Sequence, residues 1–298
     1  MKRVNKIDRI IQTENSLRDG VDPRKIFSSL QGISENDFNY YTVYLPCVGY
    51  GWIIQKEEGY ELLSRDVWYT ESGIFRNGKC TIGMGHDKNW IDEKGKILRP
   101  DGWLDGVRDF NDIGVAIGKL DGRFCWFNNE GKQLSENWYD SIREIEDDHF
   151  LFLIHDREKG YNLSHPDGIP LLSSWYFYVF PVYPKEKSAV VSREKIDSGG
   201  DYESCILDLD SGEELCDWYT WIGNFGDTGW GVVVREEGIE NRFNFINARG
   251  KLMTPDKWYE KTEPFMSGKG TITVEGRKLK VNSSGNVVEE EPTQKNLK

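Results

Sequence analysis

One stretch of the chain decides its fold: Phe243-Asn244-Phe245-Ile246-Asn247-Ala248-Arg249-Gly250-Lys251-Leu252-Met253-Thr254-Pro255-Asp256-Lys257-Trp258-Tyr259. Its first part ends in an apolar pair and Asn247, and Gly250 follows three residues later. An Asn or Asp side chain can bond the backbone two residues on, and glycine tolerates the positive φ of a tight turn. The stretch therefore predicts a strand, a turn, a second short strand and a polar passage to a Trp-Tyr pair.

The same features recur along most of the chain. A tryptophan returns at spacings of 35, 35, 37, 43 and 40 residues, at Trp68, Trp103, Trp138, Trp175, Trp218 and Trp258. A glycine precedes each of these by six to nine residues, and a seventh follows them, at Gly59, Gly95, Gly131, Gly168, Gly212, Gly250 and Gly285. Two series that stay in step over more than 200 residues indicate a tandem repeat.

The composition favours β structure. The 298 residues include 11 Trp, 14 Tyr and 14 Phe but three Ala, and aromatic residues are enriched in strands whereas Ala is the strongest helix former. We expect an all-β fold of about seven tandem three-stranded antiparallel units. Such small units must pack on their neighbours. The ladder tryptophans and the apolar residues before the turns are expected to form the shared core, the latter being Ile91, Phe127, Leu163, Leu207, Ile246 and Val281.

Two arrangements of these units fit the sequence. Unequal unit lengths and a truncated seventh unit favour an open superhelix or solenoid with capped ends. Seven turn glycines fit a propeller-like ring as well.

Three segments are expected along the chain. Residues 1–40 are predicted to form an N-terminal helical cap, or else a docking or oligomerisation arm, with helix to about residue 34. Apolar residues recur there at helical spacing, and Asp22-Pro23 is typical of an N-cap followed by proline. The repeat domain is expected over residues 41–288. Residues 289–298 are expected to be a polar tail that frays.

The stretch from Phe243 to Tyr259, with Phe265 and Gly268 behind it, resembles a bacterial and phage WG repeat. That family shows an aromatic-Ile-Asp/Asn-x-x-Gly-Lys turn, a Tyr or Trp step, and then Phe-x-x-Gly. The resemblance covers roughly residues 48–288 and implies β-rich, non-catalytic modules. The name-giving Trp-Gly is mostly absent, since Trp230-Gly231 lies elsewhere in its unit.

Charge and cysteine content exclude some classes of function. The chain has 38 Lys and Arg against 50 Asp and Glu, a net charge of −12, whereas nucleic-acid binding needs clustered cations. No run of 18 apolar residues and no apolar signal region occur, so neither a membrane association nor secretion is expected. Five widely spaced cysteines fit reduced thiols in a cytoplasmic protein.

No motif points to catalysis, a metal or a cofactor. His149 and His155 lie six residues apart but do not have the spacing of a zinc site. The segment 208–213 begins like a calcium loop, yet no bidentate Glu closes it and it falls on a repeat turn. We therefore expect a protein that is not an enzyme and that uses neither cofactor nor metal.

Departures from the repeat are the best candidates for binding. Trp221 and Trp230 lie outside the tryptophan series and the strands before the turns, and an aromatic run at 176–183 lengthens one unit. Exposed Tyr and Trp are typical of interface hot spots. The predicted contact residues are Tyr176, Tyr178, Tyr183, Trp221 and Trp230, with additional core filling as the alternative.

The function expected from these features is a non-catalytic protein-binding repeat module: an adaptor, an inhibitor or an immunity-type partner. Its acidic, aromatic surface would suit a basic protein. Two alternatives stay open. One is a carbohydrate-binding repeat array that uses the aromatic rows, and the other is a phage-encoded structural or host-interference protein.

Overall fold

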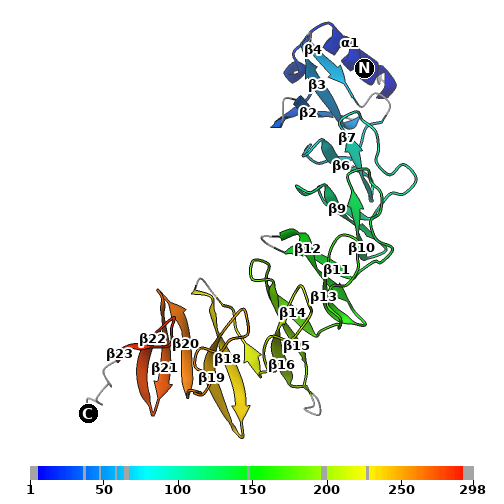
Figure 1. Ribbon diagram of the computed structural model, residues 1–298. Coiled ribbons are helices and arrows are strands. Elements are labelled where there is room, and N and C mark those ends of the chain that lie inside the picture. The colour runs from blue at the N-terminus through cyan, green and yellow to red at the C-terminus, as the bar shows by residue number, and fades with distance from the viewer. Residues whose placement is uncertain are drawn as a thin grey trace, which may run out of the picture. The chain divides into compact units, whose positions relative to one another are not determined.

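The computed structural model describes residues 6–35, 38–46, 48–57, 59–63, 67–145, 148–195, 200–225 and 228–290 (Figure 1). Within these ranges the chain forms one α-helix, α1 (Lys6–Arg18), one short 3-10 helix, η1 (Pro23–Lys25), and 23 strands. The strands pair into seven antiparallel sheets, each a meander in chain order. The expected all-β class and the expected tandem units are confirmed. Their arrangement as a superhelix or a ring stays a prediction.

The strands of the first four sheets are β1 (Ser29–Glu35), β2 (Phe38–Leu45), β3 (Gly49–Lys56) and β4 (Gly59–Leu62); β5 (Glu71–Ser72), β6 (Lys79–Met84) and β7 (Asp87–Asp92); β8 (Gly106–Val107), β9 (Val115–Leu120) and β10 (Arg123–Asn128); and β11 (Ser141–Ile145), β12 (Asp148–Asp156) and β13 (Gly160–Ser164). The strands of the last three sheets are β14 (Tyr178–Tyr183), β15 (Ser188–Glu194) and β16 (Tyr202–Asp208); β17 (Trp221–Ile222), β18 (Trp230–Glu237) and β19 (Glu240–Asn247); and β20 (Lys261–Met266), β21 (Lys269–Val274), β22 (Arg277–Asn282) and β23 (Val287–Glu290).

The chain divides into two compact parts, each of which contains several repeats. One comprises Met1–Ile142 with Pro166–Ile169, and the other comprises Arg143–His165 with Pro170–Lys298. The border falls inside β11, so the division does not follow the repeat.

The predicted Asx-Gly turn is present at the end of the third strand of the repeat. The Oδ1 atom of Asp92 accepts hydrogen bonds from the backbone N–H groups of Lys94 and Lys96, at 2.9 and 2.8 Å. The same two bonds recur at three further turns, which begin at Asn128, Asn247 and Asn282. Gly59 is an exception among the seven glycines, because it lies opposite Lys56 in the β3–β4 hairpin.

Several of the turn glycines also lie against the backbone of the preceding repeat. A Cβ atom on Gly250, whose φ is +73°, would lie 2.1 Å from the carbonyl oxygen of Leu215. A Cβ atom on Gly131 would lie 2.9 Å from the carbonyl oxygen of Leu98. Leu98 and Leu215 each follow the turn of the repeat before. Only glycine therefore meets both demands of these positions, the positive φ and the close approach of another backbone.

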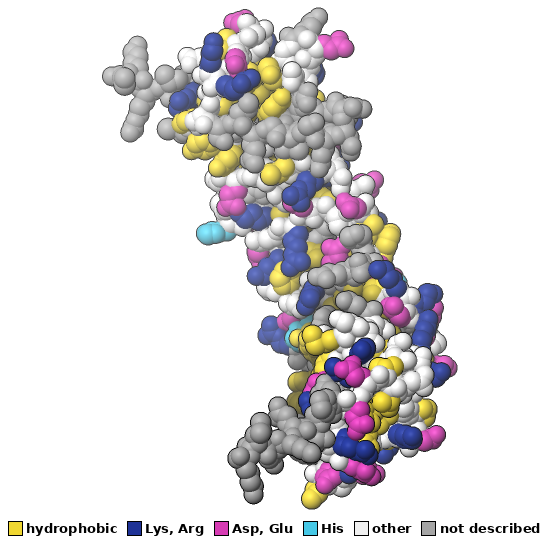
Figure 2. Space-filling view, turned by 90° about the vertical axis from the view of Figure 1, so that its left-hand side faces the viewer, with side chains coloured by type: hydrophobic (Ala, Val, Ile, Leu, Met, Phe, Trp, Pro, Cys, Tyr) yellow, Lys and Arg dark blue, Asp and Glu magenta, His cyan; other side chains and the backbone are white. Residues whose placement is uncertain are grey.

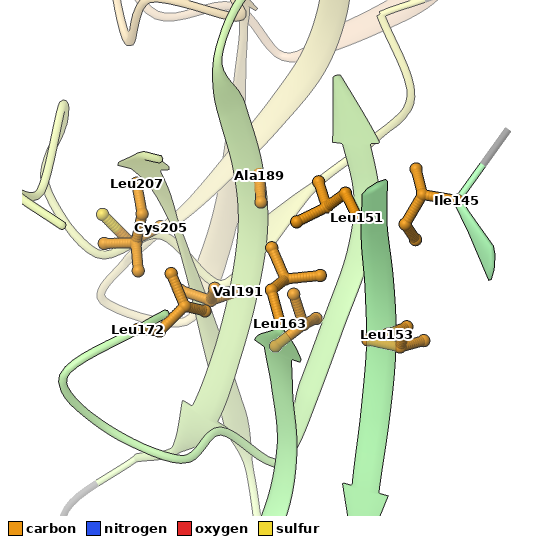
Figure 3. Close-up of a cluster of buried hydrophobic side chains, with 10 residues drawn as sticks. Ile145, Leu151, Leu153, Leu163, Leu172, Ala189, Val191, Cys205 and Leu207 are labelled. Atoms are coloured by element: carbon orange, nitrogen blue, oxygen red, sulfur yellow. The ribbon is translucent and has the colours of Figure 1, made fainter. Parts of the chain in front are cut away.

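The third strand of each unit forms the centre of the packing. Cys125, Trp126 and Phe127 of β10 are consecutive and fully buried. Because neighbouring side chains of a strand point to opposite faces, such a run means that both faces are covered. Figure 3 shows this between two sheets, where Leu163 of β13 packs with Ala189 and Val191 of β15. All six apolar residues predicted before the turns are buried.

The ladder tryptophans differ from the expectation. Trp68 is buried, whereas the other five are half-buried. Four of these five lie at the margins of the clusters, namely Trp103, Trp138, Trp218 and Trp258. In most units the second residue of the pair is buried, at Tyr69, Leu104, Tyr139, Tyr219 and Tyr259. Its backbone pairs with the third strand, as in the Ser204–Tyr219 bridge, and adjacent side chains of an extended segment face opposite ways. The half-buried Trp of the later pairs therefore faces away from the buried residue, and Arg193 lies 3.7 Å above the ring of Trp218.

A buried polar side chain fastens the third strand to the segment after the turn. Asn162 is fully buried, and its Nδ2 donates to the carbonyl oxygens of Leu172 and Ser174 at 3.0 and 2.9 Å. Asn89 and Asn244 make equivalent bonds. Such a bond satisfies backbone groups that would otherwise be buried without a partner. The position of these side chains, three residues before the turn residue, is called the lock position below.

The N-terminal segment corrects the predicted boundary. The helix ends at Arg18 rather than near residue 34, and the strands begin at Ser29, so a domain border between residues 40 and 41 would cut β2. Strand β1 pairs along its length with the aromatic β2, and this pairing overrides local helical spacing. Leu17 of α1 is buried with Val43 and Leu62 of the first sheet. The predicted cap at Asp22 is present, but it begins only the three-residue η1. Val4 lies outside the described residues.

The predicted tail begins later than residue 289. Glu289 and Glu290 belong to β23, which pairs with β22 through Lys280 and Leu279. Charged residues on a final strand discourage pairing with another chain. Residues 291–298 lie outside the described part of the chain.

The glycine contact predicts unequal effects of one substitution at two turns. Gly250→Ala and Gly212→Ala both place a side chain at a φ of +73°, which costs about 1–2 kcal/mol. In the described part of the chain no heavy atom lies within 4 Å of a Cβ built on Gly212. Gly250→Ala also overpacks the Leu215 carbonyl, which adds about 1–3 kcal/mol. We expect Gly250→Ala to lower the urea midpoint of unfolding more than Gly212→Ala. Equal midpoints would contradict the contact.

Tyr219 predicts a loss of stability at alkaline pH. Burial, followed by the nearby Cys216 and Asp217, raises the pKa of its phenol from 10.0 to about 12. A group whose folded pKa is raised contributes stability that is present below its unfolded pKa and is lost as the pH rises through the folded pKa. The free energy of unfolding should therefore fall between pH 10 and about 12. Urea titrations over this window should show a shallower fall for Tyr219→Phe, and an unchanged slope in that variant would contradict the assignment.

Candidate protein-binding surface

The five predicted contact residues fall into two groups. Trp221 and Tyr178 are exposed, with 52% and 43% of their surface accessible. Tyr176, Tyr183 and Trp230 are half-buried and pack against core clusters.

The half-buried group is held by contacts with the scaffold. The ring of Tyr183 lies 4.6 Å from that of Phe225, whose backbone N–H donates to the Tyr183 hydroxyl at 3.0 Å. Burial raises the pKa of both Tyr183 and Tyr176. Tyr176 also exchanges two backbone hydrogen bonds with Tyr161. These side chains therefore pack against the core and are also partly exposed to solvent.

Tyr178 and Trp221 occupy the same place in successive repeats. Each is the first residue of the first strand of its sheet, two residues after the second member of the Trp-Tyr pair. The equivalent residues of the other repeats are Glu71, Gly106, Ser141 and Lys261. Four units thus carry a polar residue or glycine where these two carry a large ring. The scaffold does not need an aromatic residue at this position.

Two further exposed rings accompany them. Phe177 and Tyr202 stack with centroids 4.1 Å apart and planes inclined by 26°, while 56% and 41% of their surfaces remain accessible. The bridge between Ser204 and Tyr219 joins the segment that carries Tyr202 to the segment that carries Trp221, each two residues from the bridge. We call Phe177, Tyr178, Tyr202 and Trp221 the aromatic row.

Sequence reasoning missed Phe177 and Tyr202. Phe177 immediately precedes β14 and Tyr202 begins β16, and their pairing depends on the fold bringing these two strands into one sheet. The available signal was the position of Tyr202, six residues before the turn at Asp208. The position of Tyr202 indicates a contact with Phe177 only once the register of the strands is known.

The scaffold fixes the orientation of these rings. A Cβ atom on Gly223 would lie 2.5 Å from the Trp221 ring, so the indole lies directly over this glycine. The ring of Tyr178 packs edge-on against Tyr161 at 5.6 Å, and Tyr161 lies 4.4 Å from the ring of His155. Rings held in this way lose little conformational entropy when a partner binds.

Acidic side chains lie beside the aromatic row. Glu194 is the cross-strand neighbour of Tyr202, and Asp201 precedes it in the chain. Lys195 is bonded to Glu236 at 2.7 Å. That bond, with the charges of Glu236, Asp201 and Glu203, raises the pKa of Lys195. Three acids, Glu236, Asp201 and Glu203, thus lie near this lysine, and Glu203 is itself paired with Arg193 at 2.7 Å. On the face shown in Figure 2 the two signs of charge are interspersed.

The described residues contain no group of three or more His, Cys, Asp or Glu that would hold a metal ion. The side chain of His149 lies outside the description, and His155 packs against Tyr161. The calcium-like segment is a turn, in which Asp208 accepts bonds from the N–H groups of Asp210 and Ser211. These bonds lower the pKa of Asp208.

No helix among the described residues is long and apolar enough to span a bilayer.

Comparisons with known proteins leave the family open. No family model matches the sequence, and no curated protein matches it. Among solved structures, a eukaryotic initiation factor is similar at 10% identity, with a TM-score of 0.39 over 89% of this chain and 78% of that chain. The computationally designed Ika8 protein is similar at 11% identity, with a TM-score of 0.33 over 89% and 87%. The Neurospora crassa Pan2 WD40 domain is similar at 7% identity, with a TM-score of 0.27 over 83% and 85%. Likenesses this distant carry no argument about function.

Proposed function

We propose that this chain is a non-catalytic, protein-binding repeat module of the WG type that acts as an adaptor, inhibitor or immunity-type partner through the aromatic row. One observation carries the proposal. The first residue of the first strand is small or polar in four repeats, but it is an exposed aromatic ring in two successive ones, at Tyr178 and Trp221.

The physical properties of the row support a protein as ligand. Large rigid rings that are already oriented make the strongest contributions to protein interfaces, where Trp and Tyr dominate. Clustered exposed apolar surface on an otherwise charged protein marks an interaction site. Phe177 and Tyr202, stacked and exposed, extend this surface.

The charges next to the row support a basic partner. Glu194 and Asp201 flank Tyr202, and the whole chain carries a net charge of −12. Complementary charge accelerates encounter and lowers the affinity for acidic competitors. Association should therefore slow as ionic strength increases.

Affinity purification from the native organism with three forms of the full chain tests the proposal. The double variant Trp221→Ala/Tyr202→Ala removes two rings of the row. Ile239→Ala is the control, because Ile239 is fully exposed in the β18–β19 turn outside the row. We expect the wild type and Ile239→Ala to retain one specific protein, and the double variant to bind it about tenfold or more weakly, as loss of hot-spot contacts implies.

Unchanged unfolding midpoints would show that the variants are folded. Recovery of no specific protein, or equal recovery by all three forms, would contradict the proposal. Binding to a glycan array that is lost in Trp221→Ala would instead favour the carbohydrate-binding alternative.

A further inference from the structure

The lock position holds cysteine instead of asparagine in two repeats. Cys125 donates through its thiol to the carbonyl oxygen of Ser135 at 3.3 Å, and Cys205 donates to that of Cys216 at 3.1 Å. In the second case both residues of the lock are cysteines. Their Sγ atoms lie 3.8 Å apart, and both are free thiols.

The backbone register places these two cysteines opposite each other. Leu207 bridges Glu214, and the N–H of Leu215 donates to the carbonyl oxygen of Ile206 at 2.8 Å. One further step of the same antiparallel register pairs Cys205 with Cys216. The hydrogen bonds on either side of the Leu207–Glu214 bridge show that these two residues form a non-hydrogen-bonded pair. Such pairs alternate with hydrogen-bonded pairs along an antiparallel ladder. Cys205 and Cys216, two residues further along, therefore also form a non-hydrogen-bonded pair. Side chains of such pairs approach closely, within the separation that a disulfide spans.

We propose that Cys205 and Cys216 form a redox-active pair that a small-molecule disulfide converts into an intramolecular disulfide, replacing the hydrogen-bonded lock with a covalent one. The Cys216 thiolate attacks one sulfur of oxidised glutathione and expels one glutathione thiolate. Cys205 then loses its proton and attacks the Cys216 sulfur, which expels the second. Two protein thiols are oxidised by two electrons, and one glutathione disulfide is reduced to two thiols.

The surroundings set the order of these steps. Cys205 is fully buried in the cluster shown in Figure 3, whereas Cys216 is half-buried between the β14–β16 and β17–β19 clusters. The Cys205 side chain stabilises the Cys216 thiolate and lowers the pKa of Cys216. The more accessible and more acidic thiol is the one that attacks an external disulfide.

Two other buried cysteines lack these features. Burial raises the pKa of Cys80 to about 12 and that of Cys125 to about 11. The Cys80 thiol lies beside the Ser72 hydroxyl and the Thr81 carbonyl, and the Cys125 thiol lies beside the carbonyls of Trp126 and Ser135. Cys125 is the matched control, because it occupies the same lock position opposite a serine. Cys47 lies outside the described residues.

The test is incubation of the folded full chain with oxidised glutathione, followed by intact-mass analysis and non-reducing peptide mapping. The wild type and Cys125→Ser should each lose two hydrogens and give a peptide linking Cys205 to Cys216. Cys216→Ser should not. The oxidised wild type should unfold at a higher temperature than the reduced form, because the cross-link closes the loop between the two residues in the unfolded chain.

Other outcomes would overturn the inference. These are a wild type that stays fully reduced, a glutathione adduct on Cys216 that never resolves onto Cys205, and a disulfide that maps to another cysteine. The mapping of the linked peptide uses the unaltered chain, so it decides the question even if Cys216→Ser fails to fold.

Discussion

The contact between a turn glycine and the backbone of the preceding repeat is the constraint on which the rest of the structure depends. Gly131 against Leu98 and Gly250 against Leu215 leave no room for a side chain. At these two turns the close approach holds one repeat against the repeat before it. A single three-stranded meander cannot bury its own apolar side chains, and its neighbours complete its core.

This packing also explains where the aromatic residues lie. Trp52, Trp90 and Trp126 fill equivalent, fully buried places in the third strand, and the second residue of the Trp-Tyr pair closes most of the clusters. Once these structural places are assigned, an exposed ring at a repeat position that is polar elsewhere becomes informative. Tyr178 and Trp221 stand out for this reason. The lock position is informative in the same way, because both residues of the lock are cysteines at Cys205 and Cys216, whereas Cys125 and Asn162 face residues without sulfur.

Much of this was predictable from sequence, because turns are local. Asp92 or Asn247 followed three residues later by glycine specifies its own backbone bonds, and the predicted turns and the buried residues before them are observed. The orientation of the Trp-Tyr pair was not predictable, because it is set by a bridge to a strand some 15 residues earlier. The same limit applies to β1, which needs β2 to become a strand, and to the stacking of Phe177 on Tyr202. The local spacing of residues in the sequence does not indicate such pairings.

Native-state hydrogen exchange of Gly131→Ala tests the coupling between repeats most directly. The amide of Leu98 belongs to the preceding repeat and donates to the carbonyl oxygen of Trp90, while the amide of Lys132 belongs to the altered turn. If the glycine contact joins the repeats, both amides should lose protection together. Faster exchange confined to Lys132 and its neighbours, with Leu98 unchanged, would contradict the account.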